Sequence, residues 1–299
     1  MIRLKNVIIE MVIYLFKFSQ IMSKYKNILV DREYDGKIYI VTINREEFAN
    51  AINRATAEEL ADAFRAFDTD DQARVAILTG KGKYFCAGAD LKSLSQANDV
   101  QDAPSMINRL ETSGDGPLGV SRMILSKPVI AAINGHAVAG GFELALWCDM
   151  RITYKDCDMG VYCRRFGVPL IDGGTLRLPL LIGLSRAMDL ILTGRTVKGE
   201  EGYTIGLINR LTQEREEVLK EAVNLARSLC DLPQTCMRND RMSVLTNIYK
   251  LDMKKYMENE FGYGMLSLKS GEAFVGAKKF AKGEGKHGKK LNTELRPKL

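Results

Sequence analysis

The chain has 299 residues, 46% of them apolar, which is enough to bury one large core. Its two histidines, His136 and His287, nearly exclude a histidine-rich metal site, and a Ser-His-Asp triad would have to use one of them. The formal net charge of +6 is confined to the segment from Lys278 to Leu299, because acidic and basic residues balance before it. This tail is either a solvated surface or a contact for the phosphates of coenzyme A, nucleic acid or a membrane.

The first 21 residues differ in character from the rest. The stretch from Val7 to Phe16 is apolar apart from Glu10 and is too short to span a membrane. The segment weakly resembles a mitochondrial presequence, or it results from a start codon upstream of Met22.

Six scattered cysteines without a CxxC pair indicate an intracellular compartment. The final Pro-Lys-Leu differs by one residue from a peroxisomal address, so mitochondrial, peroxisomal and cytoplasmic locations all stay open.

The first globular stretch is predicted to contain two strands with a helix between them. Residues 37–43 and 73–79 are rich in β-branched side chains, which is typical of strands. Thr56 and Glu59 form a predicted capping box, and apolar residues at helical spacing follow as far as Phe67.

The remainder begins with residues 95–117, whose glycines and Pro117 predict a mobile connection around short helices. Strands are predicted over 129–133 and 150–154, and helices over 183–192, 214–229 and 249–261. Strands that alternate with helices and then give way to helices alone indicate an α/β core with a helical C-terminal part. The predicted units are an extension at 1–21, a core at 22–215, a helical region at 216–288 and a basic tail at 289–299.

Two glycine-containing segments carry the strongest chemical signal. They are Phe85 to Leu91 and Ala132 to Leu144, and each leads from an apolar, strand-like run into a helix-like one. Two backbone N–H groups aimed at one carbonyl oxygen form an oxyanion hole, and Glu143 supplies a titratable group beside it. Taken singly, the first segment favours an ordinary strand-to-helix turn, and the alternative for Glu143 is a helix-capping acid.

Together the two segments resemble the crotonase (enoyl-CoA hydratase/isomerase) family, and the resemblance runs from about Asn27 to Gly288. It implies a spiral of ββα units with a helical C-terminal region that forms trimers or dimers of trimers. It also implies that the N–H groups of Ala89 and Gly140 bind a thioester oxygen and that Glu143 acts on the water or the proton. The implied substrate is a coenzyme A thioester, without a metal or redox cofactor. Substrate-binding positions implied by the resemblance are Ala51, Ala87, Gly88, Asp90, Leu91, Lys92 and Gly141.

The sequence departs from the hydratase pattern at Cys163. Hydratases of the family carry a second glutamate at this place, four residues before the glycine that matches Gly167. A thiol with a pKa of roughly 8.5 is a poor replacement for a carboxylic acid at neutral pH. Arg164 and Arg165 could make Cys163 a nucleophile, although a buried structural thiol is the favoured interpretation. Asp172 offers another acid, because an isomerase subgroup has a catalytic aspartate near this point; the alternative is a turn cap.

These observations predict an acyl-CoA enzyme that stabilises an enolate. Hydration of an enoyl-CoA is the first expectation, with Glu143 as the main acid/base and Asp172 as the auxiliary. Isomerisation of an enoyl- or dienoyl-CoA is the alternative, and thioester hydrolysis and decarboxylation would use the same oxyanion hole. A non-catalytic acyl-CoA-binding or RNA-binding homologue is the rival from another class, although nucleic acid is not the expected partner. Acyl-chain length is not predicted.

Overall fold

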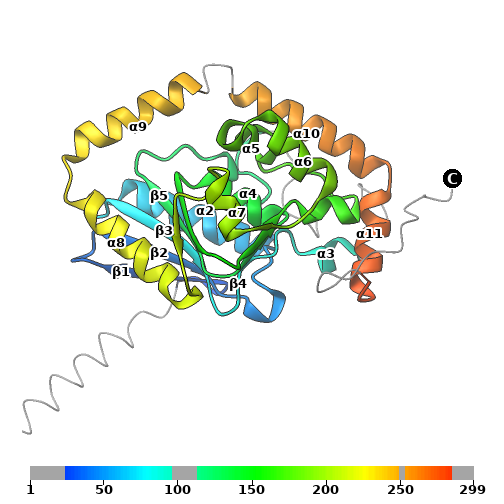
Figure 1. Ribbon diagram of the computed structural model, residues 1–299, viewed down its shortest axis with the longest axis horizontal. Coiled ribbons are helices and arrows are strands. Elements are labelled where there is room, and N and C mark those ends of the chain that lie inside the picture. The colour runs from blue at the N-terminus through cyan, green and yellow to red at the C-terminus, as the bar shows by residue number, and fades with distance from the viewer. Residues whose placement is uncertain (1–23, 96–112, 249–252, 285–299) are drawn as a thin grey trace, which may run out of the picture.

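The structure is a computed structural model that describes residues 24–95, 113–248 and 253–284 (Figure 1). The predicted extension at 1–21, the basic tail at 289–299 and most of the connection at 95–117 therefore lie outside the described residues. Among the described residues, no helix is long and apolar enough to cross a membrane.

The larger of two sheets has six strands in the order β1-β2-β3-β5-β7-β10. β1 runs antiparallel to β2, and the other neighbours are parallel. All residues of β3 and β5 are buried, because the core of the protein covers one face of the sheet and a helix covers the other. The predicted strands are confirmed as β2, β3, β5 and β7. The bounds are β1 Ile28–Glu33, β2 Ile38–Ile43, β3 Val75–Gly80, β5 Val129–Ile133, β7 Met150–Tyr154 and β10 Arg210–Thr212.

The smaller sheet has four short strands in the order β4-β6-β8-β9. They are β4 Tyr84–Cys86, β6 His136–Val138, β8 Asp158–Gly160 and β9 Val197–Lys198. A strand of the large sheet is followed by a strand of the small sheet and then by a helix in three successive turns: β3-β4-α3, β5-β6-α4 and β7-β8-η4. This repetition is the predicted spiral of ββα units.

The helices lie around the two sheets, and the last four follow one another without a strand, as predicted for the C-terminal part (Figure 1). α8 packs on the face of the large sheet opposite the main core, and α11 packs beside α3. The bounds are α2 Arg54–Thr69, α3 Leu91–Ser95, α4 Gly140–Trp147, η4 Tyr162–Phe166, α5 Gly174–Ile182, α6 Leu184–Thr193, α7 Gly199–Thr204, α8 Val218–Cys230, α9 Gln234–Ile248, α10 Met253–Lys269 and α11 Glu272–Ala281.

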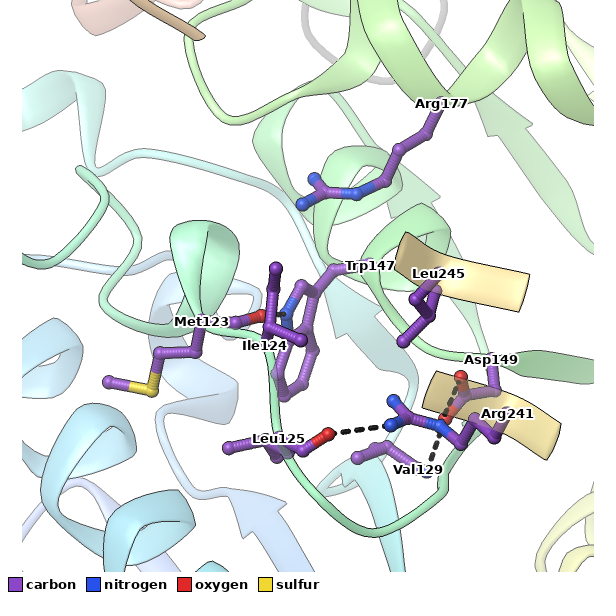
Figure 2. A pocket seen from close by; sticks show the side chains of 9 residues that line it. All are labelled: Met123, Ile124, Leu125, Val129, Trp147, Asp149, Arg177, Arg241 and Leu245. Atoms are coloured by element: carbon purple, nitrogen blue, oxygen red, sulfur yellow. Dashed lines mark hydrogen bonds and ion pairs between the residues drawn. The ribbon is translucent and has the colours of Figure 1, made fainter. Parts of the chain in front are cut away.

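α9 is attached to the core by Arg241 (Figure 2). Its guanidinium donates to the Asp149 carboxylate at 2.8 Å and to the Leu125 carbonyl oxygen at 2.6 Å. A pocket lies beside this contact, and it is lined by Met123, Ile124, Leu125, Val129, Trp147, Asp149, Arg177, Arg241 and Leu245.

α2 begins two residues before the predicted capping box. Asn53 is its N-cap, and the Asn53 side-chain oxygen accepts the Thr56 N–H at 3.0 Å. Glu59 instead accepts the main-chain N–H of Asn27 at 2.8 Å, so it attaches the start of β1 to the helix. The predicted capping box was therefore wrong, because a better-placed side-chain acceptor precedes Thr56.

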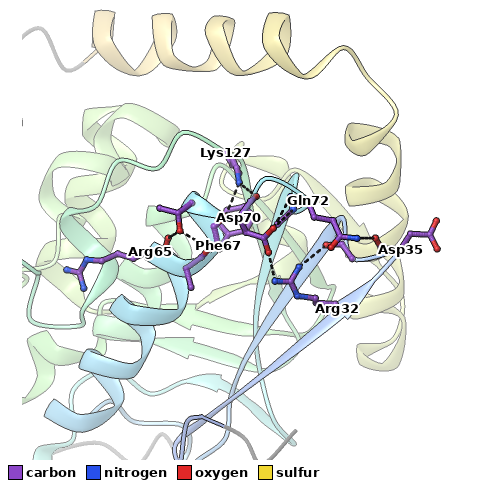
Figure 3. Close-up of polar contacts among 11 residues, drawn as sticks. Arg32, Asp35, Arg65, Phe67, Asp70, Gln72 and Lys127 are labelled. Atoms are coloured by element: carbon purple, nitrogen blue, oxygen red, sulfur yellow. Dashed lines mark hydrogen bonds and ion pairs between the residues drawn. The ribbon is translucent and has the colours of Figure 1, made fainter. Parts of the chain in front are cut away.

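The C-terminal end of α2 is closed by a buried lysine (Figure 3). The Lys127 ammonium group donates to the carbonyl oxygens of Phe67 at 3.0 Å and Asp70 at 2.5 Å. These carbonyls lie where a helix leaves acceptors unpaired and where its dipole favours a cation. Burial lowers the pKa of Lys127, so these bonds offset part of the cost of placing an ammonium group there.

Candidate active site

Strand pairing brings the two predicted oxyanion donors together. β4 and β6 are parallel neighbours in which Cys86 is paired with Ala137. Ala89 follows Cys86 by three positions and Gly140 follows Ala137 by three positions, so the two residues lie at the same end of the paired strands. A Cβ atom on Gly88 would lie 2.6 Å from the Gly140 nitrogen, and Gly88 has a φ of +91°. Only glycine fits this close approach without strain.

The Ala89 N–H is directed away from its neighbouring segment by a short bridge. Ile52 donates to the Gly88 carbonyl at 2.8 Å, and Asp90 donates to the Ile52 carbonyl at 3.0 Å. Ala89 lies between these two bonded residues of a parallel bridge, so its own N–H points away from Ile52. Within the described ranges, the Ala89 N–H donates to no other residue.

The Gly140 N–H lies at the beginning of α4, where a helix has no intrahelical acceptor for it. The preceding residue, Ala139, has a φ of +53° and a ψ of −129°, a combination that a residue with a Cβ rarely adopts. This backbone conformation turns the chain from β6 into α4. The positive end of the α4 dipole therefore lies beside the same point that Ala89 faces.

Glu143 lies in the first turn of α4 and is 2% exposed. Its Oε1 accepts the N–H of Asp172 at 3.0 Å and the N–H of Gly174 at 2.8 Å. Burial raises the pKa of Glu143 well above its ordinary value, and the nearby Asp172 and Glu260 carboxylates raise it further. The residue therefore holds a proton to an unusually high pH, which is typical of groups that exchange protons with a substrate.

Asp172 is buried, and its main-chain N–H contacts Glu143. Its Oδ1 accepts the Leu118 N–H at 3.0 Å and the hydroxyl of Ser121. Burial raises the pKa of Asp172 to about 6, although the bonds from Ser121 and Leu118 oppose this increase. These side-chain bonds reach residues more than 50 positions earlier in the chain, so Asp172 is not a simple local turn cap.

A third buried carboxylate, Glu260 of α10, was missed by the sequence analysis. Its Oε2 accepts the Gly173 N–H at 2.7 Å, and its Oε1 accepts the Thr175 N–H at 3.0 Å and the Thr175 hydroxyl at 2.6 Å. The helical spacing of Met257 and Phe261, which are both buried, would have placed Glu260 on the inner face of the helix. Nothing in the sequence indicates what that face contacts.

Cys163 lies in the η4 turn and is buried near Glu143. Burial raises the pKa of its thiol to about 12, which leaves almost no thiolate near neutral pH. Burial outweighs the opposing effect of Arg164 on this pKa, and both neighbouring guanidinium groups bond to carbonyl oxygens elsewhere. Arg164 donates to the Ile191 carbonyl at 3.2 Å, and Arg165 donates to the Gly194 carbonyl at 3.0 Å. The geometry supports the structural interpretation of this thiol.

The predicted substrate-binding positions fall into two groups. Those from Ala87 to Lys92 lie together beside Ala51, where the Arg45 guanidinium donates to the Ala51 carbonyl and to the Asp90 carboxylate at 3.1 Å. Gly141 belongs to the second glycine segment and packs against the residue just before Ala87, where an added Cβ would be 2.0 Å from the Cys86 carbonyl oxygen. Packing alone accounts for Gly141, and its role toward a substrate stays a prediction.

Arg177 lines the pocket of Figure 2 and also contacts the turn that contains Asp172. The buried Arg177 guanidinium donates to the Asp172 carbonyl at 2.8 Å and to the Ser121 carbonyl at 2.6 Å. It thereby fixes the two segments that meet at the Asp172 carboxyl group. In the described part of the chain, no group of three or more His, Cys, Asp or Glu side chains could hold a metal ion.

Paired N–H donors beside buried carboxyl groups, on a spiral of ββα units, define the class of crotonase-fold enzymes. The chain belongs to the enoyl-CoA hydratase/isomerase family, whose model matches residues 33–264. Enzymes of this family act on coenzyme A thioesters.

Individual relatives agree with this family. The chain is 36% identical over 219 residues to a crotonyl-CoA hydratase of Syntrophomonas wolfei. The match covers 72% of this chain and 79% of the relative. The chain is 33% identical over 233 residues to a carnitinyl-CoA dehydratase of Escherichia coli O157:H7, which covers 77% and 83%. The crystal structure of a carnitinyl-CoA hydratase from Mycobacterium avium superposes with a TM-score of 0.76 at 27% identity and covers 91% of this chain and all of that one. These likenesses support an enoyl-CoA hydratase-like enzyme.

Proposed function

We propose that this protein adds water to the double bond of an enoyl-CoA thioester and catalyses the reverse dehydration. The observation that carries the proposal is the juxtaposition of the Ala89 and Gly140 N–H groups with the buried carboxyl groups of Glu143 and Asp172. The crotonyl-CoA hydratase among its relatives makes crotonyl-CoA the first substrate to test.

In this mechanism the thioester oxygen accepts hydrogen bonds from Ala89 and Gly140. A water oxygen forms a bond to the β-carbon while the π electrons move to the thioester oxygen, which gives an enolate that the two donors stabilise. Glu143, the main acid/base, takes up a proton of the water as the C–O bond forms, and Asp172 is the auxiliary. The enolate then collapses to the 3-hydroxyacyl thioester as its α-carbon takes a proton from the carboxyl pair. Because both pKa values are raised, the pair holds a proton to higher pH than isolated carboxyl groups do, which lets one carboxyl group act as an acid while the other acts as a base.

Double-bond isomerisation is the second candidate, and Cys163 favours it. Isomerisation only moves a proton from one carbon to another, so it does not need a second glutamate to position water. The same oxyanion donors and the same carboxyl pair would serve. The non-catalytic alternative is less compatible with the site, since two buried carboxyl groups with raised pKa values beside paired N–H donors are typical of a catalytic centre.

Mass analysis of products from a panel of enoyl-CoA thioesters of increasing chain length tests the proposal. Gain of one water by crotonyl-CoA supports hydration, and a product of unchanged mass supports isomerisation. Glu143→Gln should lower kcat by about 100-fold or more, because general acid–base catalysis contributes that much. Glu216→Gln, at an exposed position, is the matched control. Full activity of Glu143→Gln on every thioester would refute the mechanism.

We further propose that the helical region assembles the protein into trimers or dimers of trimers. Supporting this, α9 and α10 of that region expose the large apolar side chains Val244, Ile248, Tyr263 and Leu266. Light scattering of the full chain checks the mass, and a monomer at micromolar concentration would contradict the proposal.

A further inference from the structure

Two carboxylates divide between them the N–H groups of one turn. The N–H groups of Asp172 and Gly174 donate to Glu143, whereas those of Gly173 and Thr175 donate to Glu260. Glu143 comes from α4 in the core, and Glu260 comes from α10 in the C-terminal region. The turn is therefore held from two sides by side chains that lie far apart in the sequence.

The turn needs this support because of its own sequence. Gly173 has a φ of +92° and is followed by another glycine, so the free chain has more conformations there than at any ordinary residue pair. Gly174 and Thr175 also begin α5, whose first N–H groups have no intrahelical acceptor. Side-chain acceptors at this end are favoured by the helix dipole, particularly when they are anionic.

Glu260 is placed to hold the turn and not to act on the substrate. It is 8% exposed, and both of its carboxylate oxygens accept hydrogen bonds from the turn. Glu143, in contrast, accepts both of its hydrogen bonds from the described residues on Oε1, which leaves Oε2 for chemistry. The two glutamates thus share the same turn, but only one retains an oxygen for chemistry.

We propose that Glu260 is a positioning residue that fixes the turn over 172–175 and thereby sets the place of the Glu143 and Asp172 carboxyl groups. The inference rests on the proposed catalytic role of Glu143. It connects α10 to the reaction: when Glu260 releases Gly173 and Thr175, the adjacent N–H groups that hold Glu143 Oε1 lose their fixed direction. The coenzyme A contacts around Ala87 to Lys92 are not part of this turn, so substrate binding should change little.

The test compares Glu260→Gln with wild type, using Glu258→Gln, an exposed position on the same helix, as the control. One readout is hydrogen exchange of the 172–175 amides without substrate, which we expect to accelerate in Glu260→Gln only. The second is kinetics with crotonyl-CoA. We expect kcat to fall at least about tenfold with little change in KM, since a displacement of about 1 Å can cost about 100-fold. Thr175→Val removes one of the three bonds to Glu260 and should change both readouts in the same direction by less.

The outcomes separate the two proposals. If wild type turns over crotonyl-CoA while Glu260→Gln and Thr175→Val keep its kcat and its exchange rates, the positioning role is refuted and the proposed function stands. If wild type turns over no thioester, the proposed function fails, and the exchange rates alone decide whether Glu260 holds the turn. If Glu260→Gln does not fold, an unaltered Thr175→Val is sufficient to overturn the inference.

Discussion

The main-chain N–H of Asp172 donates a hydrogen bond to Oε1 of Glu143 at 3.0 Å, while the Asp172 side chain turns toward Ser121. One residue thus holds the principal carboxyl group through its backbone and places its own carboxyl group beside it. The two acids are consequently linked in geometry as well as in charge, and substitutions at Asp172 should affect Glu143.

Asp172→Asn should move the acidic side of the pH–rate profile to lower pH. A neighbouring carboxylate raises the pKa of Glu143, so replacing that carboxylate by an amide lets Glu143 ionise at lower pH. Because hydration needs an ionised carboxyl group as base, kcat/KM would then begin to rise at lower pH than in wild type. Steady-state rates with crotonyl-CoA between pH 5 and 9, about the range in which such groups titrate, check this shift. An unchanged profile would remove Asp172 from the coupled pair.

Gly88→Ala should damage the proposed oxyanion hole while leaving the fold intact. The new Cβ would lie 2.6 Å from the Gly140 nitrogen and would push the two donors apart. Loss of one such donor lowers kcat by about 100- to 1,000-fold. Gly114→Ala is the matched control, because Gly114 also has a positive φ, +82°, but has no atom within 4 Å of an added Cβ. An equal loss of rate in both variants would show that backbone strain, and not the contact with Gly140, is what matters, and no loss in either would refute the role of Gly88.

Cys163→Ser should retain hydration close to the wild-type rate. The thiol is buried and its pKa is raised to about 12, so it contributes no thiolate at neutral pH. Iodoacetamide at neutral pH should accordingly label the exposed Cys236 and leave Cys163 unmodified, as mass mapping of the peptides would show. Loss of all turnover in a folded Cys163→Ser would instead assign this sulfur to the chemistry.

Lys127→Met should destabilise the protein without changing the kinetics of the folded fraction. It leaves the Phe67 and Asp70 carbonyl oxygens without their buried donor (Figure 3), and an unsatisfied buried polar group costs about 1–3 kcal/mol. Urea unfolding measures the difference, with Lys81→Met at an exposed position as the control. Equal midpoints for the two variants would mean that water replaces the ammonium group at these carbonyls.

The sequence predicted the parts of the fold that depend on local pattern. Central strands such as β3 and β5 are continuous apolar runs because both faces of the sheet are covered, so composition alone revealed them. β4 and β6 are three residues long and lie inside the glycine segments, where no periodicity can develop. Their pairing, which aligns Ala89 with Gly140, became visible only in three dimensions.

The residues of the candidate site also divide into those that the local sequence indicates and those that it does not. Glu143 could be proposed from the sequence because a charge in the apolar start of α4 requires an explanation. Glu260 meets the same turn from 87 residues away, and Ser121 reaches Asp172 across 51 residues. Contacts of this kind depend on how α10 and the segment before β5, which contains Ser121, pack against the turn at Asp172. Neither helical spacing nor a local motif encodes this packing.

The equal three-residue spacing from Cys86 to Ala89 and from Ala137 to Gly140 places a limit on how this protein can diverge. A one-residue insertion in either connection would rotate one N–H away from the thioester oxygen while its partner stayed in place. The lengths of these two connections therefore have to match for both N–H groups to face one point.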